Sequence, residues 1–296
     1  MSVKSMMFIF SGASPNSNAL EAALSLSASW AASLRIVYLA DQTLAPAAYA
    51  HSDNFATAGI TQAQMVSSQN SELQRDAVEA AAHAVREVTA RHGVSVAEVT
   101  ETSDLVPESV TFQSVPDDHK TRLIRESRTV DLILTGYDHL ANDDMNPLLT
   151  ALFHSGRPVI SIPRMAGRAL AKGAPASIAI AWDGGLSASR AVREALPLLR
   201  QAKQVRVITV RSRGDDTGDQ QILAYLRLHG VTAELDLLKP DGHSVGAALL
   251  EQTSAFGADL LVMGAYGHGH LAEMVLGGVT NHIVKHSQVP LFLVHG

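Results

Sequence analysis

Apolar runs alternate with amphipathic stretches along most of the chain. In the C-terminal part, short runs that favour strands are separated by segments whose apolar side chains recur at helical spacing. Several runs are uniformly apolar, which is typical of parallel strands covered on both faces. The pattern predicts an α/β fold. The predicted strands are 178–182, 205–210, 231–238, 260–263 and 291–294; the predicted helices are 220–228, 244–256, one with Ala191, Val192, Ala195, Leu196 and Leu199 on one face, and one after the glycine segment 264–278.

The same order occurs twice. Residues 5–24 match 177–196, 34–41 match 205–212, and 130–139 with 154–163 match 258–267 with 286–296. A repeat period above 100 residues indicates a duplicated domain rather than a solenoid. We therefore predict two tandem open-sheet domains, each a mostly parallel five-stranded sheet with helices on both faces. They are residues 1–163 and 177–296, and the small, basic, Gly- and Pro-bearing segment 164–176 is the predicted linker.

The N-terminal domain contains a longer excursion after its second strand. It runs from Asp41 to about Ser71 and is rich in Ala, Ser, Gln and Asn. We interpret it as a loop that leads into a long helix ending near Gly93. The predicted buried stripe of that helix is Leu73, Ala77, Ala80, Ala84 and Val88.

Composition narrows the function classes. The 296 residues carry a formal net charge of −6 and no long basic run, which argues against nucleic-acid and anionic-membrane binding. No cysteine is present, so disulfides, thiolate metal sites and a cysteine nucleophile are excluded. The apolar start of the chain is too short for a signal peptide, and no run is long enough to span a bilayer. We expect a soluble, cytoplasmic protein.

The segment GAYGHGHLAEMVLGG, residues 264–278, holds two glycine clusters around a helix-like stretch. Glycine lets backbone amides approach an anion, and a helix start adds unpaired N–H groups. The segment follows a strand, where open parallel sheets bind ligands. It therefore indicates a phosphate cradle, and the alternative is a turn with a closely packed helix.

This spacing resembles the universal stress protein family in its tandem two-domain form. ATP-binding members share Gly, two residues, Gly, nine residues, Gly, then Ser or Thr. Gly264, Gly267 and Gly277 fit that pattern, whereas Gly278 stands where the family has a hydroxyl. Val279 and Thr280 continue as in the family, and VPLFLV resembles its closing strand.

The resemblance implies a Rossmann-like fold, similar to the adenine nucleotide alpha hydrolases, and an ATP site in the C-terminal domain, with Mg²⁺ as a further expectation. Asp183 would face the adenine or ribose, and Val210 would pack on the base. The phosphates would lie among Gly264, Gly267, Gly277, Gly278 and Val279, with Thr280 beside them and His268 either touching phosphate or facing solvent. The two domains would pair through their last strands, 159–162 and 291–294, which also hides two apolar sheet edges.

The N-terminal copy has lost the pattern. Counting along the sequence places Gly12 opposite Asp183 and Gly136 opposite Gly264, while His139 replaces Gly267. Asp138, Asp143 and Asp144 would repel phosphate, so we expect a structural partner. A divalent cation at Asp143 and Asp144 is a less favoured alternative, because adjacent acids in a polar loop are usually solvated. A metal on His268 and His270 is also less favoured, because no third ligand has suitable spacing.

Three functions stay open at this point. The favoured one is a stress-response or regulatory protein that binds ATP, with the N-terminal domain as scaffold. The others are an interaction module without nucleotide and a slow ATPase. No catalytic residue is singled out, and the lysine of a P-loop is absent from the sequence. The protein partner is unknown, and both a monomer and a homodimer are compatible with the sequence.

Overall fold

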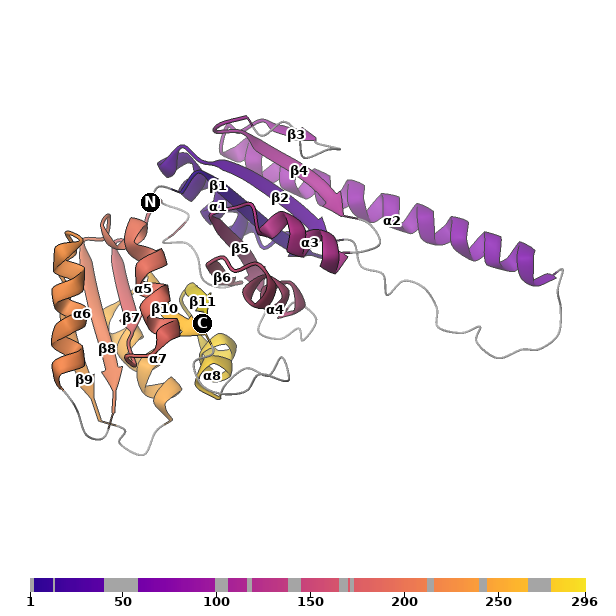
Figure 1. Ribbon diagram of the computed structural model, residues 1–296. Coiled ribbons are helices and arrows are strands. Elements are labelled where there is room, and N and C mark those ends of the chain that lie inside the picture. The colour runs from indigo at the N-terminus through magenta and orange to yellow at the C-terminus, as the bar shows by residue number, and fades with distance from the viewer. Residues whose placement is uncertain are drawn as a thin grey trace.

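A single sheet organises the chain in the computed structural model. The structure describes residues 3–12, 14–39, 58–98, 106–115, 119–137, 145–164, 170, 173–211, 216–239, 244–265 and 278–296. Within these ranges 11 strands form one mostly parallel sheet with helices on both faces (Figure 1). The predicted fold class is therefore confirmed.

The strands fall into two half-sheets that follow the chain. The N-terminal strands are β1 (Ser5–Ser11), β2 (Ser33–Leu39), β3 (Val96–Glu98), β4 (Val110–Val115), β5 (Leu132–Tyr137) and β6 (Val159–Pro163). The C-terminal strands are β7 (Ser177–Ala181), β8 (Gln204–Val210), β9 (Glu234–Leu238), β10 (Leu260–Ala265) and β11 (Leu291–His295). The sheet order is β3-β4-β2-β1-β5-β6-β11-β10-β7-β8-β9. The N-terminal half differs from the five predicted strands by β3, which adds a short edge to β4.

The half-sheets join through their last strands. β6 and β11 pair antiparallel, with Ser161 opposite Leu291 and Val159 opposite Leu293. Every residue of β6 is buried, as are the first four of β11, so either strand would expose an apolar edge without the other. The predicted pairing of these strands is confirmed.

Two helical layers cover the sheet, and alternate strand residues point to each. The helices α1 (Ser17–Trp30), α2 (Ala58–Arg91), α5 (Leu186–Leu199) and α6 (Asp216–Leu228) pack on one face. The helices α3 (His119–Ser127), α4 (Met145–His154), α7 (Val245–Phe256) and α8 (Gly278–His286) pack on the other. In β1, for example, Phe8 belongs to the first core and Met7 to the second.

Local signals explain several helix boundaries. The Ser244 side chain accepts a hydrogen bond from the Ala247 N–H at 3.2 Å and caps α7, and Gly257 ends that helix at φ 68°. The predicted apolar face of α5 is buried as expected. α6 begins at Asp216, earlier than predicted, and β9 begins at Glu234, later than predicted.

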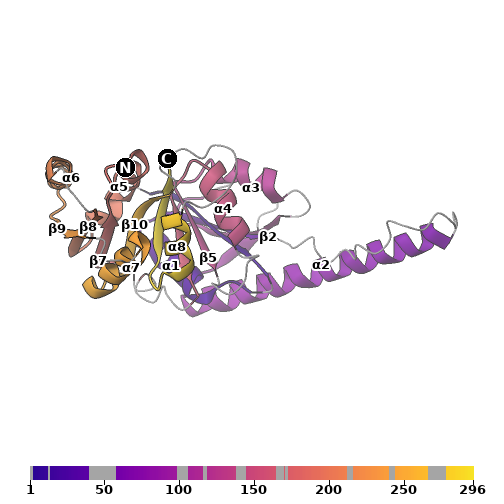
Figure 2. The ribbon, with the colours of Figure 1, turned by 90° about the horizontal axis from the view of Figure 1, so that it is seen from below.

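The long helix α2 ends at Arg91, close to the predicted end. Its buried stripe was predicted only in part, because Val88 is buried as predicted whereas Ala80 is exposed. Leu73 is 49% exposed, and the buried side chains are Ala81, Ala82, Val85, Val88 and Thr89. The amino-terminal part of α2 extends beyond the sheet (Figures 1 and 2). Only the carboxyl-terminal turns therefore pack against the sheet. The buried side chains lie in these turns, and not along the whole length of the helix as the helical repeat predicted.

Most of the predicted linker lies outside the described residues, but Leu170 is fully buried in the core shared with α1 and α5. At the start of this segment the Asn18 amide donates to the Arg164 carbonyl at 2.9 Å. The connection is thus anchored to the body at two points. None of the helices in the described ranges combines the length and apolar character needed to cross a membrane.

An arginine occupies the second strand of each half. Its carboxylate partner comes from a helix in the N-terminal half and from a strand in the C-terminal half. Arg35 is 3% exposed and lies 3.5 Å from Glu126 of α3, to which Gln113 of β4 donates. Arg206 instead donates to Asp236 of β9 at 2.8 Å, and Gln252 of α7 donates to the same carboxylate at 2.6 Å. Strand register makes Gln113 and Asp236 equivalent.

Close strand–helix contact requires a glycine in each half. A Cβ on Gly264 of β10 would lie 2.5 Å from the Ala188 nitrogen at the start of α5. A Cβ on Gly136 of β5 would lie 2.5 Å from Asn16 Cβ, at the start of α1. Both distances are shorter than any Cβ contact allows. The two glycines therefore share a packing role.

Removing the carboxylate beside the buried arginine should be costly. We expect Glu126→Leu to lower the free energy of unfolding by about 3–5 kcal/mol, because Arg35 then keeps an uncompensated buried charge. The double variant Arg35→Leu/Glu126→Leu should recover much of this loss. Urea unfolding of the three proteins measures both effects, and a double variant no more stable than Glu126→Leu would contradict the pairing.

A methyl group at Gly264 should also destabilise the protein. We expect Gly264→Ala to cost about 1–3 kcal/mol, because the Cβ forces β10 and α5 apart. Gly218 of α6 is the matched control, since its Cβ would meet open space. Gly218→Ala should leave stability unchanged or raise it by up to about 1 kcal/mol. Equal urea midpoints for the two variants would show that the close contact at Gly264 is not made.

Candidate functional site

The candidate site lies at one edge of the C-terminal half-sheet. β7 pairs with β8 on one side and with β10 on the other, so the strand order reverses between β7 and β10. All three strands are parallel, and their carboxyl ends meet at the same edge. Open α/β sheets bind ligands at such reversal points.

Asp183 and Val210 are brought together at this edge. The register pairs Ala181 with Ile208, which sets Asp183 level with Val210. The Asp183 side chain is exposed, and its Oδ1 accepts a 2.7 Å hydrogen bond from the Gly185 N–H. Gly184 between them has φ 74°, which glycine adopts readily. The turn thus holds the carboxylate at the carboxyl end of β7.

Val210 presents a half-buried apolar side chain beside that carboxylate. Its neighbour Arg211 donates from Nη2 to the Asp219 carboxylate, which is 2% exposed. Sequence reasoning missed this pair. The available signal was an arginine directly after a strand and an aspartate in the first turns of the next helix. The pair joins the end of β8, beside Val210, to the start of α6.

The glycines of the motif have different structural settings. Gly264 lies on β10 at this edge, and its contact with α5 accounts for it without a ligand. Gly278 is the exposed first residue of α8, with open space around its Cα. Val279 is 39% exposed and Thr280 is buried. The first turn of α8 offers backbone N–H groups, as predicted for an anion site. The predicted residues Gly267, His268 and Gly277 lie outside the described residues, as does His270.

The N-terminal half differs at the equivalent edge, and one sequence assignment needs correction. β1 pairs with β2 so that Ser11 lies level with Leu39. Ser11, not Gly12, therefore stands where the C-terminal half has Asp183. Gly12, at φ 81°, corresponds to Gly184. The error arose because the turn after β1 is longer than the one after β7, which shifts a simple count.

The acidic residues predicted to repel phosphate in the N-terminal half, Asp138, Asp143 and Asp144, lie outside the described residues, as does His139. Among the described residues no three His, Cys, Asp or Glu side chains are grouped so that they could hold a metal ion. The proposed cation alternatives on the aspartates and histidines therefore remain untested predictions.

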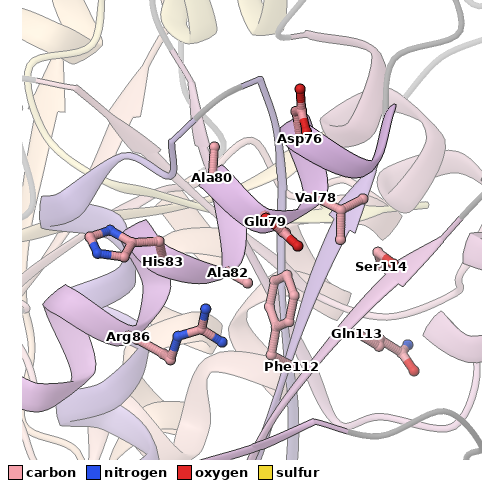
Figure 3. A pocket seen from close by; sticks show the side chains of 10 residues that line it. All are labelled: Asp76, Val78, Glu79, Ala80, Ala82, His83, Arg86, Phe112, Gln113 and Ser114. Carbon is pink, nitrogen blue, oxygen red and sulfur yellow. The ribbon is translucent and has the colours of Figure 1, made fainter. Parts of the chain in front are cut away.

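A hollow that the sequence did not indicate lies between α2 and β4 (Figure 3). It has a volume of about 710 Å³. Asp76, Glu79, His83 and Arg86 line it from the helix, and Phe112 lines it from the strand. Charges of both signs share the hollow, so its electrostatics favour no single class of ligand.

Comparisons with known proteins agree with this fold. The family model described as the universal stress protein family matches residues 238–295. No curated protein sequence matches the chain. A universal stress protein from Archaeoglobus fulgidus DSM 4304 is 15% identical with a TM-score of 0.64, and the match covers 99% of this chain and 97% of that one. A putative universal stress protein from Pseudomonas aeruginosa UCBPP-PA14 is 11% identical with a TM-score of 0.59, over 99% and 93% of the two chains.

Identities this low show a shared fold rather than shared chemistry. The full-length structural matches fit a tandem two-domain form, and the family match covers β9's last residue through β11, including the glycine segment. The resemblance indicated by the glycine spacing is therefore confirmed: the C-terminal segment matches the universal stress protein family, and the whole chain has the fold of solved universal stress proteins.

Proposed function

We propose that this protein is a stress-response or regulatory protein that binds ATP, or a related adenine nucleotide, in its C-terminal half. The observation that supports the proposal is that Asp183 and Val210 lie level with each other, beside the end of β10, at one reversal of strand order. Asp183 accepts hydrogen bonds from the ribose or the adenine amine, and Val210 packs against the base. The phosphates, with Mg²⁺ as counter-ion, bind the amides of Gly264, Gly267, Gly277, Gly278 and Val279. Thr280 lies beside them, and His268 contacts phosphate.

The N-terminal half acts as a structural partner in this proposal. Ser11 replaces the carboxylate, and Leu39 replaces Val210. The retained glycine, Gly136, is explained by its contact with α1 alone. A site that keeps its packing residues and lacks its ligand-binding residues is expected of a copy that serves as scaffold.

We further propose that the halves are separate domains, residues 1–163 and 177–296, with 164–176 as the connection. Each half has its own helices on both faces, and in the described part of the chain strand pairing between the halves is limited to β6 and β11. A repeat of one ancestral unit accounts for the equivalent arginines Arg35 and Arg206.

An interaction module without nucleotide is the second candidate. Two observations favour it: packing explains Gly264, and Gly278 supplies no hydroxyl. In this case the exposed edge would serve a protein partner or a second copy of the chain. Slow ATP hydrolysis is a lesser variant of the first proposal, for which no catalytic residue is named.

Calorimetric titration with ATP and Mg²⁺ tests the two candidates. We expect about one ATP per chain, and Asp183→Ala should weaken binding by about tenfold or more, because a charge-assisted hydrogen bond is lost. Ser11→Ala is the matched control in the N-terminal half and should bind as the wild type does. Absence of binding by the wild type would favour the interaction module.

Restoring a hydroxyl at the start of α8 should strengthen binding. The backbone at Gly278 is open and does not require a positive φ, so Gly278→Ser fits without strain. One added hydrogen bond to phosphate predicts an affinity gain of about two- to tenfold. Gly218→Ser, also in open space, is the control in the same titration. An unchanged affinity in Gly278→Ser would place the phosphates away from α8.

A further inference from the structure

A cavity of about 410 Å³ lies where the two half-sheets meet. It opens at the carboxyl end of β11, beside the turn that leads into β6, and the end of α4 and the first turns of α5 enclose it. Its volume is within the range of small-molecule sites, about 300–1,000 Å³. Both halves of the chain therefore contribute walls to one cavity.

Three arginines line this cavity. Arg190 and Arg193 come from α5, and Arg157 comes from the turn before β6. Glu194 brings the one side-chain carboxylate among the described residues of the lining. In a chain with a net charge of −6, this is a local excess of positive charge.

Two of these guanidinium groups are unpaired. Within the described residues neither Arg190 nor Arg193 has a carboxylate within 4.0 Å, although Glu194 and the end of the chain at Gly296 are near. By contrast, Arg35, Arg206 and Arg211 each have an acidic partner. The cavity arginines thus have donors to spare.

The positions of the arginines are fixed by the fold. Arg190 and Arg193 lie one helical turn apart on the exposed side of α5, while that helix buries Ala191 and Val192. Arg157 is held by its Nη2, which donates to the Arg128 carbonyl at 2.7 Å. Gly156 before it has φ 67° and sets the turn. Three arginines from two elements thus line one cavity.

The equivalent positions in the other half carry no such charge. Arg190 and Arg193 are the fifth and eighth residues after the N-cap Gly185 of α5; the same steps from the N-cap Asn16 of α1 lead to Glu21 and Leu24. Val289 stands in the place of Arg157, before the proline that precedes the last strand. The fold does not need arginines at these positions, so packing leaves them unexplained.

The imidazole at the cavity wall responds to this charge. His295 is half-buried, and its pKa is lowered from the usual value by burial, then by Arg190 and by His154. Its ring lies 5.1 Å from the Phe153 ring, edge-on. Nearby, the His154 Nε2 is buried without a hydrogen-bond partner in the described structure. Apolar and aromatic surface therefore adjoins the guanidinium groups.

We propose that this cavity binds a small phosphomonoester, whose phosphate contacts Arg157, Arg190 and Arg193 and whose apolar body packs against Phe153 and Pro158. Arginine forks match phosphate oxygens in pairs, which makes phosphate a better ligand than a simple halide. The cavity shares no described residue with the proposed nucleotide site, although β11 neighbours β10. A ligand here would bridge the N-terminal and C-terminal halves.

Titration with phenyl phosphate, followed by calorimetry, tests the proposal. We expect saturable binding of about one molecule per chain, tighter than inorganic phosphate because the phenyl ring adds apolar contact. Arg190→Gln/Arg193→Gln should weaken binding at least about tenfold, since two charge-assisted contacts are lost. Both arginines are exposed, so the fold should persist, and circular dichroism checks it.

Two matched variants locate the bound probe. Arg227→Gln removes an exposed arginine of α6 and should leave affinity unchanged, as should Asp183→Ala at the proposed nucleotide site. NMR titration of His295 adds a direct readout, because a bound dianion favours the charged imidazole and raises its pKa. Absence of binding, equal affinity in the double variant, or loss of binding in Asp183→Ala alone would overturn the proposal.

Discussion

The antiparallel pair β6–β11 is the constraint on which the arrangement of this protein depends. Both strands are apolar on both faces, so neither tolerates an open edge, and each satisfies the other. Because the remaining strands of each half run parallel to its own last strand, the pairing sets the carboxyl edges of the halves at opposite sides of the sheet. The carboxyl ends of the parallel strands in the two halves are therefore kept apart. The carboxyl end of β11 meets the beginning of β6 instead, and the arginine-lined cavity forms there.

The sequence predicts the scaffold well because burial on both faces leaves a strong periodic signal. The alternation of strands and helices and the parallel sheet follow from that signal, and the pairing of the last strands follows from the family resemblance. Features that depend on distances between elements were out of reach. The helical repeat of α2 could not reveal where the sheet ends, so Leu73 was assigned to the core. Because the turn after β1 differs in length from the turn after β7, counting along the sequence matched Gly12, and not Ser11, with Asp183.

The candidate site shows the same division. Asp183 and Val210 are singled out by the family resemblance, and the register of β7 and β8 sets them level with each other. The packing role of Gly264 cannot be predicted from the sequence, because it depends on how closely α5 approaches β10. Likewise, no spacing rule links Arg157 to Arg190, which lie on different halves of the chain. The pattern of apolar residues also does not reveal which polar group accompanies a buried arginine. At equivalent strand positions, Gln113 lies near Arg35 and Asp236 pairs with Arg206.

Carrying both halves on one chain changes how their association responds to conditions. Two separate subunits joined by a strand pair would come apart on dilution, whereas a tethered pair keeps a fixed effective concentration set by the connection. Leu170, buried midway along that connection, shortens the free path between the halves. The junction, and any cavity built across it, is therefore present in every molecule regardless of how much protein a cell makes.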